Sequence, residues 1–282
     1  MPDPRLCLEA LSALLSPCSV ESTPGSSQLS PQDLVNIVAL KEFLKQQGFL
    51  ELDYPSLGTM SLQDPDPDPD QDLYGPPPAL TEGAPPGPRT TVKINPQDFF
   101  HPSFDYDFTH IKDGNRTFVR GDERYVRPCG WNRIALFVTR KYDDGNDSWL
   151  GTGKDAWPVS YQGHNMDGSL GIILTHSKDT DDEPGFLDAA AASLVSDQTK
   201  GRGVYSTPDI KMAEKYCKTF KSKVDGKTYK VVLQNRINPQ KRRKCQRDNM
   251  WLVYVPEGLT EIETRALIQE SIRPYGVLIK EV

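Results

Sequence analysis

The sequence predicts an α+β domain built mainly on antiparallel β-sheet. Short segments rich in β-branched and aromatic residues dominate the C-terminal two thirds of the chain, and one or two helical segments interrupt them. These segments do not follow the regular strand–helix alternation of a parallel sheet. The 282 residues contain no dinucleotide-binding glycine fingerprint, no P-loop and no Gly-x-Ser-x-Gly turn.

The first clear element along the chain is a helix over Ser30–Phe49. Ser30 can cap this helix, Pro31 suits its first position, and Asp33 follows Ser30 at capping-box spacing. Apolar residues fall on or near one face, namely Leu34, Ile37, Val38 and Leu44. We expect the helix to pack on the main domain, and the alternative is that it binds a protein partner.

A segment rich in proline and aspartate comes next, "QDPDPDPDQDLYGPPPALTEGAPPGP" from Gln63 to Pro88. Its Asp-Pro repeats remove backbone donors, disfavour helix and repel one another, so we expect a disordered linker that could also recruit a protein partner. The predicted organisation is an N-terminal helical segment (1–62), an acidic linker (63–89) and a domain (90–282).

The domain is expected to contain one helix, over 208–220, and a series of strands. The predicted strands are Thr90–Ile94, Arg133–Tyr142, Trp157–Gly163, Gly171–Leu174, Gly226–Ile237, Met250–Val255 and Tyr275–Val282. The strand over Arg133–Tyr142 is expected to end at the turn "DDGND".

Charge and composition exclude several classes of protein. Residues 1–89 hold 13 acidic and 4 basic residues, and residues 90–282 hold the other 26 and 29. The sequence pI of about 5.3 argues against a nucleic-acid partner. No apolar run approaches the length of a membrane span, and the N-terminal 20 residues lack the basic start of a signal peptide.

Cysteine and histidine usage points to a reducing compartment. The five cysteines are scattered and odd in number, and the four histidines show no metal-ligand spacing with them. We therefore expect reduced thiols, a cytoplasmic or nuclear location, and no bound metal.

The stretch "GRGVYSTPDIKMAEKYCKTF", Gly201–Phe220, is the most informative part of the chain. Its glycines permit close backbone approach, Thr207 can cap a helix, and Tyr205 precedes that cap at a strand-to-helix turn. The helix is expected to bury the stripe Ile210, Ala213, Cys217 and Phe220.

This stretch resembles the segment of poly(ADP-ribose) polymerase catalytic domains that reads Gly-basic-Gly-aliphatic-Tyr and then runs through a helix into Tyr-Cys. The shared positions are Gly201, Gly203, Tyr205, Ala213, Tyr216 and Cys217. The resemblance implies the ADP-ribosyltransferase fold, a mostly antiparallel split β-sheet with flanking helices, and NAD or ADP-ribose as the ligand. It also implies that Tyr205 and Tyr216 stack on the two sides of the nicotinamide ring, a contact suited to a flat heteroaromatic group.

Two further segments extend the resemblance. "PVSYQGHN" stands where the family has His-Gly-Ser or His-Gly-Thr, so Gln162 replaces the histidine that bonds the ribose, and His164 is an alternative for that role. "NMWLVYV" places Met250 at the glutamate that stabilises the oxocarbenium-like transition state. The implied triad is Gln162, Tyr205 and Met250, degenerate at two positions. The residues implied to contact NAD are Tyr161, Gly163, His164, Gly203, Ser206 and Tyr216.

A preceding block, "RPCGWNRIALFVTRKYDDGNDSWLG", is similar to uncharacterised animal and fungal proteins that carry a histidine at the place of Gln162. Three functions fit a diverged member of this kind. The first is an inactive homologue, a pseudoenzyme that binds NAD or ADP-ribose. The second is an active mono-ADP-ribosyltransferase, and the third is a protein-interaction module with a vestigial pocket.

The basic run "QKRRKCQR", Gln240–Arg247, is the remaining feature of note. We expect a solvated hairpin loop between two strands. A phosphate site, a nuclear-localisation signal and a contact with nucleic acid are the alternatives.

Overall fold

Two antiparallel sheets that meet along one strand pair form the body of the protein. The computed structural model describes residues 2–16, 18–46, 91–166, 203–245, 249–256 and 258–282. The larger sheet has the order β3 (Tyr106–Asp107), β6 (Asn132–Ala135), β13 (Ile272–Glu281), β10 (Thr228–Ile237) and β7 (Val159–Gln162), and β9 (Lys218–Lys221) also pairs with β10. The smaller sheet has the order β11 (Arg242–Lys244), β12 (Trp251–Tyr254) and β8 (Gly203–Ser206).

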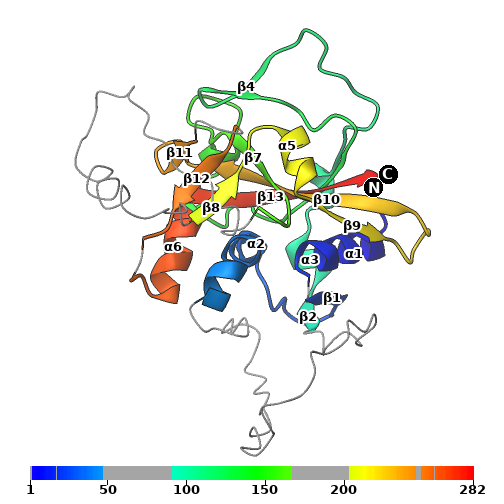
Figure 1. The fold of residues 1–282 in the computed structure, drawn as a ribbon. Helices are drawn as coiled ribbons and strands as arrows, with labels where there is room; N and C mark the ends of the chain where they lie inside the picture. The colour runs from blue at the N-terminus through cyan, green and yellow to red at the C-terminus, as the bar shows by residue number, and fades with distance from the viewer. Residues whose placement is uncertain (1, 17, 47–90, 167–202, 246–248, 257) are drawn as a thin grey trace, which may run out of the picture.

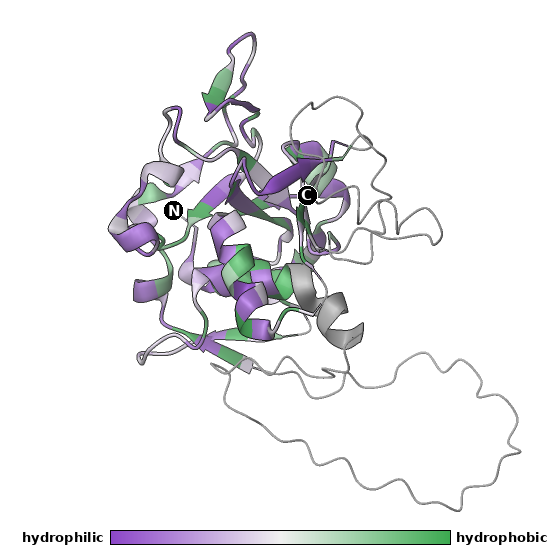
Figure 2. Ribbon diagram, turned by 90° about the vertical axis from the view of Figure 1, so that its left-hand side faces the viewer, coloured by the Kyte–Doolittle hydropathy of each residue, from purple (hydrophilic) through white to green (hydrophobic). Residues whose placement is uncertain are grey.

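Two smaller ladders complete the strands of the described residues. β1 (Ser19–Ser22) pairs in parallel with β2 (Thr91–Ile94), and β4 (Phe118–Arg120) forms a hairpin with β5 (Glu123–Tyr125). The region around β4 projects from the body in both views (Figures 1 and 2). All the other ladders are antiparallel, so the predicted α+β class with mostly antiparallel sheet is confirmed.

Helices cover the sheets on both sides. The helices are α1 (Pro4–Leu14), α2 (Pro31–Gln46), α3 (Pro96–Phe99), α5 (Ile210–Lys215) and α6 (Glu261–Ser271), with 3-10 turns at Pro102–Phe104, Asp143–Gly145 and Ser148–Leu150. In Figure 1, α1 and α2 lie below the long strands β10 and β13, and α5 lies above them. α1 contacts β9, β10 and β13, whereas α2 contacts β8, β13 and α6. None of the described helices is long and apolar enough to cross a membrane.

One hydrophobic core joins the N-terminal helices to the strands that follow the acidic segment. Its buried residues run from Leu6 on α1 and Leu34 on α2 to Val277 on β13. The predicted linker lies outside the described residues. The part of the N-terminal segment that the structure describes thus packs together with residues 91–282.

The start of α2 follows the capping pattern in its sequence. The Asp33 carboxylate accepts hydrogen bonds from the Ser30 amide (2.8 Å) and the Ser30 hydroxyl (2.9 Å). Every residue from Gln32 to Val38 is buried. The polar members need partners inside the protein, and Gln32 donates to the Ile272 carbonyl oxygen (3.0 Å) and accepts from the Tyr142 hydroxyl (3.1 Å). We conclude that α2 packs on the sheet, as expected.

Five of the predicted strands are found: four contain β2, β7, β10 and β12, and the fifth overlaps β13, which begins three residues before the predicted Tyr275. The strand predicted over Arg133–Tyr142 is shorter, because β6 ends at Ala135. Beyond it the Phe137 amide bonds the Phe99 carbonyl oxygen (2.9 Å), and Arg140 has a positive φ of 58°, so the chain turns away from the sheet. The segment Gly171–Leu174 lies outside the described residues.

The prediction of a helix over 208–220 is wrong in the length of the helix and in the residue that caps its N-terminus. α5 ends at Lys215, and Asp209, not Thr207, caps it by accepting from the Lys211 amide (2.9 Å). The residues that follow form β9 because β10 offers them a complete antiparallel ladder, from Lys218 opposite Val231 onward. This long-range pairing outweighs the helical spacing of the apolar residues.

The basic run also differs from the expected loop. Arg242–Lys244 form the strand β11 against β12. The Arg242 side chain is nearly buried, donates to Glu123 (2.6 Å) and lies 4.0 Å from the centre of the Trp251 ring. One arginine of the run is therefore a structural cation and is not displayed to solvent.

Candidate functional site

The three positions of the predicted triad lie on or next to three strands that are neighbours in space. Gln162 is the last residue of β7, Tyr205 lies within β8, and Met250 immediately precedes β12. All three side chains are wholly buried. Segments that are 43 and 45 residues apart in the sequence are thus neighbours where the two sheets meet.

A single antiparallel bridge, Tyr161 opposite Thr207, connects the two sheets between β7 and β8. It is closed by two backbone hydrogen bonds, from the Tyr161 amide to the Thr207 carbonyl oxygen (2.7 Å) and in the reverse direction (3.0 Å). The Thr207 hydroxyl then donates to the Asn249 carbonyl oxygen (2.8 Å), next to Met250. The bridge and this bond fix the three strand ends together.

Strand alternation distributes the triad positions over two faces. Tyr205 lies opposite Leu252, so Tyr205, Thr207 and Met250 share one face of the smaller sheet. Gln162 lies opposite Leu233, on the other face from Tyr161. The register of the bridge places Ser206 beside Gln162. The structure therefore brings Tyr205 and Met250 together, and Gln162 belongs to a separate group.

That group is a polar cluster formed by Ser160, Gln162, Ser206 and Asn235. Ser160 lies directly opposite Asn235 in the β7–β10 ladder, and all four side chains are wholly buried. Six of their polar atoms have no hydrogen-bond partner among the described residues, namely both amide atoms of Gln162 and of Asn235 and the two hydroxyls. Each unsatisfied buried atom costs about 1–3 kcal/mol, so together they rival the stability of a domain, about 5–15 kcal/mol. The cluster needs water or a neutral polar ligand.

Ser160 and Asn235 were not predicted as site residues. Polar side chains two residues apart in a buried strand, as in "VSYQ", are the sequence signal that points to them.

Gly163, which the resemblance implies contacts NAD, is packed against the end of α5. A Cβ atom at this position would lie 2.6 Å from the Tyr216 carbonyl carbon and 2.8 Å from the Ala213 carbonyl oxygen, so no larger residue fits. The Gly163 amide donates to the sulfur of Met166 (3.3 Å), which is itself wholly buried. The structure thus joins Gly163 to Tyr216, the second predicted tyrosine, and Tyr216 is the C-cap of α5.

Only glycine fits at position 203, because the backbone of β8 approaches β12 closely there. Its φ is +153°, and a Cβ atom there would lie 2.0 Å from the Val253 carbonyl oxygen. The first glycine of the predicted motif, Gly201, lies outside the described residues.

His164 is held by the N-terminal helix. Its Nδ1 atom donates to the Leu14 carbonyl oxygen at the end of α1 (2.7 Å), and the ring is buried. The residue predicted as an alternative to the missing histidine therefore links the loop after β7 to α1.

The triad positions offer no ionised group near neutral pH. Burial raises the pKa of the Tyr205 phenol above its ordinary value, and it raises that of the neighbouring Tyr161 as well. The Tyr161 hydroxyl donates to the Val126 carbonyl oxygen (2.7 Å). An amide, a phenol and a thioether can bind a neutral group, but they cannot stabilise a developing cation as a carboxylate does.

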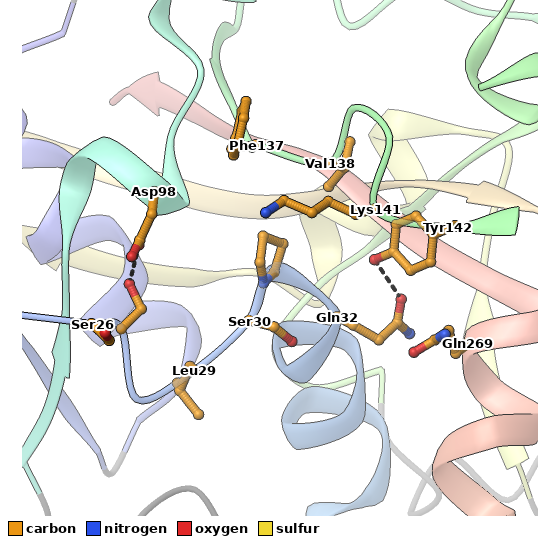
Figure 3. Close-up of a pocket in the computed structure, with 12 residues that line it drawn as sticks. Ser26, Leu29, Ser30, Gln32, Asp98, Phe137, Val138, Lys141, Tyr142 and Gln269 are labelled. Carbon is orange, nitrogen blue, oxygen red and sulfur yellow. Dashed lines mark hydrogen bonds between the residues drawn. The ribbon is translucent and has the colours of Figure 1, made fainter. Parts of the chain in front are cut away.

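A separate cavity of about 350 Å³ lies between the N-terminal segment, α3, the 137–142 loop and α6 (Figure 3). Lys141 extends into it with its ammonium group 4.9 Å from the centre of the Phe137 ring. The lining also includes Ser30, Asp98 and Gln269, and none of the predicted site residues. These residues come from four distant segments, so no motif in the sequence points to the cavity.

No group of three or more metal-ligating side chains occurs in the described part of the chain. All five cysteines are free thiols. Comparison with known proteins gives no match to a family model, to a curated protein or to a solved structure.

Proposed function

We propose that this chain has the ADP-ribosyltransferase fold and binds NAD or ADP-ribose where β7, β8 and β12 meet, without efficient catalysis. The observation that carries the proposal is the position of the three motifs. Each was identified from its own residues, and Gln162, Tyr205 and Met250 then fall on or next to three neighbouring strands. A chance likeness in three separate segments has no reason to bring their strands together, although the Gln162 side chain lies on the other face from Tyr205 and Met250.

The close packing of the glycines adds support. Gly163 and Gly203 stand at positions where a Cβ atom would collide with backbone atoms of Tyr216 and Val253. The resemblance assigns one of these glycines to the carboxamide and the other to the tyrosine turn. Both therefore occupy sites that need glycine for physical reasons, and Gly163 touches the residue proposed to stack on nicotinamide.

Chemistry favours binding over catalysis. Replacing the catalytic glutamate by Met250 removes the charge that faces the oxocarbenium-like transition state. Losing one electrostatic donor of this kind costs about 10²–10³ in rate. With Gln162 in place of the histidine as well, we infer an NAD-binding homologue whose transferase activity is lost or very slow.

One observation favours the alternative of an interaction module with a vestigial pocket. Tyr205 and Met250 are wholly buried, and the Gly163 amide is bonded to Met166. In this closed arrangement the nicotinamide ring has to displace protein atoms before it can bind.

Thermal shift and calorimetry with NAD, ADP-ribose and nicotinamide distinguish an NAD-binding homologue from an interaction module with a vestigial pocket. We expect a rise in Tm with millimolar ligand that is lost in Tyr216→Ala, which removes a half-buried ring at the end of α5. The matched control is Tyr106→Ala, on the distant edge strand β3. Absence of any shift for the three ligands in the unmodified chain refutes NAD binding and leaves the interaction module.

Transferase activity is a separate measurement. Incorporation of labelled NAD is compared between the unmodified chain and the Gln162→His, Met250→Glu double variant. Activity that appears only in the double variant supports the assigned triad positions, and activity in the unmodified chain supports the mono-ADP-ribosyltransferase.

A further inference from the structure

Arg236 on β10 is a buried cation with neutral partners. It is 4% exposed, and its guanidinium donates to the carbonyl oxygens of Trp157 (2.7 Å), Leu150 (2.7 Å) and Gly151 (3.0 Å). Its Nε atom has no hydrogen-bond partner within the described part of the chain. Buried charges are normally paired with a charge of opposite sign, so this arginine needs a counter-charge.

Two more arginines lie beside it. Arg133 and Arg236 both approach the ring of Tyr275, at 5.6 Å and 5.1 Å from its centre. Arg120 lies 4.8 Å from the centre of the Tyr125 ring. We call Arg120, Arg133 and Arg236 the arginine cluster. In the described ranges no ion pair joins any of the three to a carboxylate.

The cluster carries more positive charge than its surroundings offset. Burial lowers the pKa of Arg236, and the like charges of Arg120 and Arg133 lower it further. Asp105 interacts with the charge of Arg133 and also accepts a hydrogen bond from the Ala135 amide (2.8 Å), so its single negative charge offsets at most one of the three positive charges. An added anion would relieve the repulsion between three guanidinium groups.

The cluster also has donors to spare. Among the described residues, the Nε atom of Arg133 is buried without a partner while its Nη2 atom donates to the Phe104 carbonyl oxygen (2.8 Å), and the Arg120 guanidinium bonds only the neighbouring Val119 carbonyl oxygen (2.8 Å). Gly276 leaves the space in which Arg133 lies, because a Cβ atom there would be 2.8 Å from Arg133 Cδ. Arg120 and Arg133 are half-buried, so part of the cluster is accessible to solvent.

We propose that the arginine cluster binds a phosphate group, either free or carried by a small ligand. Guanidinium groups match the geometry of phosphate oxygens, and a doubly charged anion offsets three cations better than a single carboxylate does. The proposal does not depend on the NAD pocket, because none of the three arginines belongs to the triad or to the residues implied to contact NAD.

Thermal shift with inorganic phosphate and with ribose 5-phosphate, each against sodium chloride of equal ionic strength, tests the site. For a Kd of about 1 mM, about 10 mM phosphate is expected to raise Tm by about 3 °C. If ribose 5-phosphate raises Tm more than inorganic phosphate does, the ligand is a phosphate ester. If inorganic phosphate raises Tm as much or more, the ligand is free phosphate. Malonate, a dicarboxylate, is expected to give a smaller shift than either.

Arg120→Gln is the informative variant, because Arg236 also holds the 150–157 loop through its carbonyl bonds and its loss would disturb the fold. We expect Arg120→Gln to reduce the phosphate-induced shift at least about threefold. Arg124→Gln removes the same charge from an exposed position on the same hairpin and is expected to leave the shift unchanged. Equal shifts in phosphate and chloride, a larger shift in malonate, or equal losses in the two variants would each overturn the proposal.

Discussion

Replacing Met250 by glutamate tests whether the buried junction can hold the charge that catalysis requires. Met250 is wholly buried, and the residues directly opposite it are Thr207 and Cys245, whose amide bonds the Met250 carbonyl oxygen (2.8 Å). Neither of these two residues is basic, and Arg243, farther along the same face, extends over the Tyr254 ring, 5.7 Å from its centre. Burial without a cation favours the neutral carboxyl, so the pKa of the new glutamate is expected to rise by about 3 units or more.

The sign and size of the effect follow from proton linkage. A carboxyl whose pKa is raised by folding binds more protons in the folded state, so the free energy of unfolding falls as pH rises above the unfolded pKa of about 4.3. The fall is about 1.4 kcal/mol per pH unit. Between pH 5 and pH 7.5 the Met250→Glu variant should lose about 3 kcal/mol relative to Met250→Gln, which buries a neutral group of similar size and cancels the cost of polar burial.

Urea denaturation of both variants at the two pH values measures this difference. If the two variants are equally stable at pH 7.5, the junction is hydrated or contains an unrecognised cation. The argument that Met250 marks a site closed to charge would then fail, and restored catalysis by the double variant would become plausible on energetic grounds.

Two other predictions concern packing and ion pairing. Gly163→Ala places a Cβ atom 2.6 Å from the Tyr216 backbone and is expected to lower the free energy of unfolding by about 1–3 kcal/mol in urea denaturation, whereas Gly153→Ala, with nothing within 4 Å, should change it little. Hydrogen bonds from the nearly buried Arg273 (2.6 and 2.8 Å) hold the pKa of Asp143 below its ordinary value, so their contribution is present near neutral pH and is lost as pH falls below about 4. Asp143→Asn should therefore cost about 1 kcal/mol at pH 7, because Asp143 is half exposed, and progressively less as pH falls below about 4; a cost that does not change with pH contradicts this assignment.

Local patterns in the sequence are sufficient to predict the two long strands, β10 and β13. The alternation and β-branched content of Gly226–Ile237 and Tyr275–Val282 correspond to β10 and β13, and the capping pattern at Ser30 corresponds to the start of α2. These elements agree with their local preferences, so tertiary contacts reinforce a choice that the sequence already favours.

The errors arose where long-range pairing decides. The apolar spacing through Cys217 and Phe220 reads as a helix, yet β10 draws Lys218–Lys221 into β9. α6 (Glu261–Ser271) is absent from the predicted elements, although the sequence carries a signal for it. That signal is the capping box that Thr260 and Glu263 form at its start. The register of the Tyr161–Thr207 bridge decides which triad side chains share a face of the sheet. No local sequence pattern specifies that register.

The order of strands in the larger sheet has a consequence for folding during synthesis. β13 is the last of these strands along the chain, yet it lies in the middle of the sheet between β10 and β6 and also contacts α2. Until residues 272–281 leave the ribosome, β6 and β10 share no partner, and the Ile272 carbonyl oxygen that binds Gln32 across 240 positions does not yet exist. The edges of β6 and β10 and the N-terminal helices therefore stay without their β13 contacts until this strand is synthesised. We expect chaperones to bind the nascent chain during this interval, and we expect a chain that terminates before β13 to fail to fold.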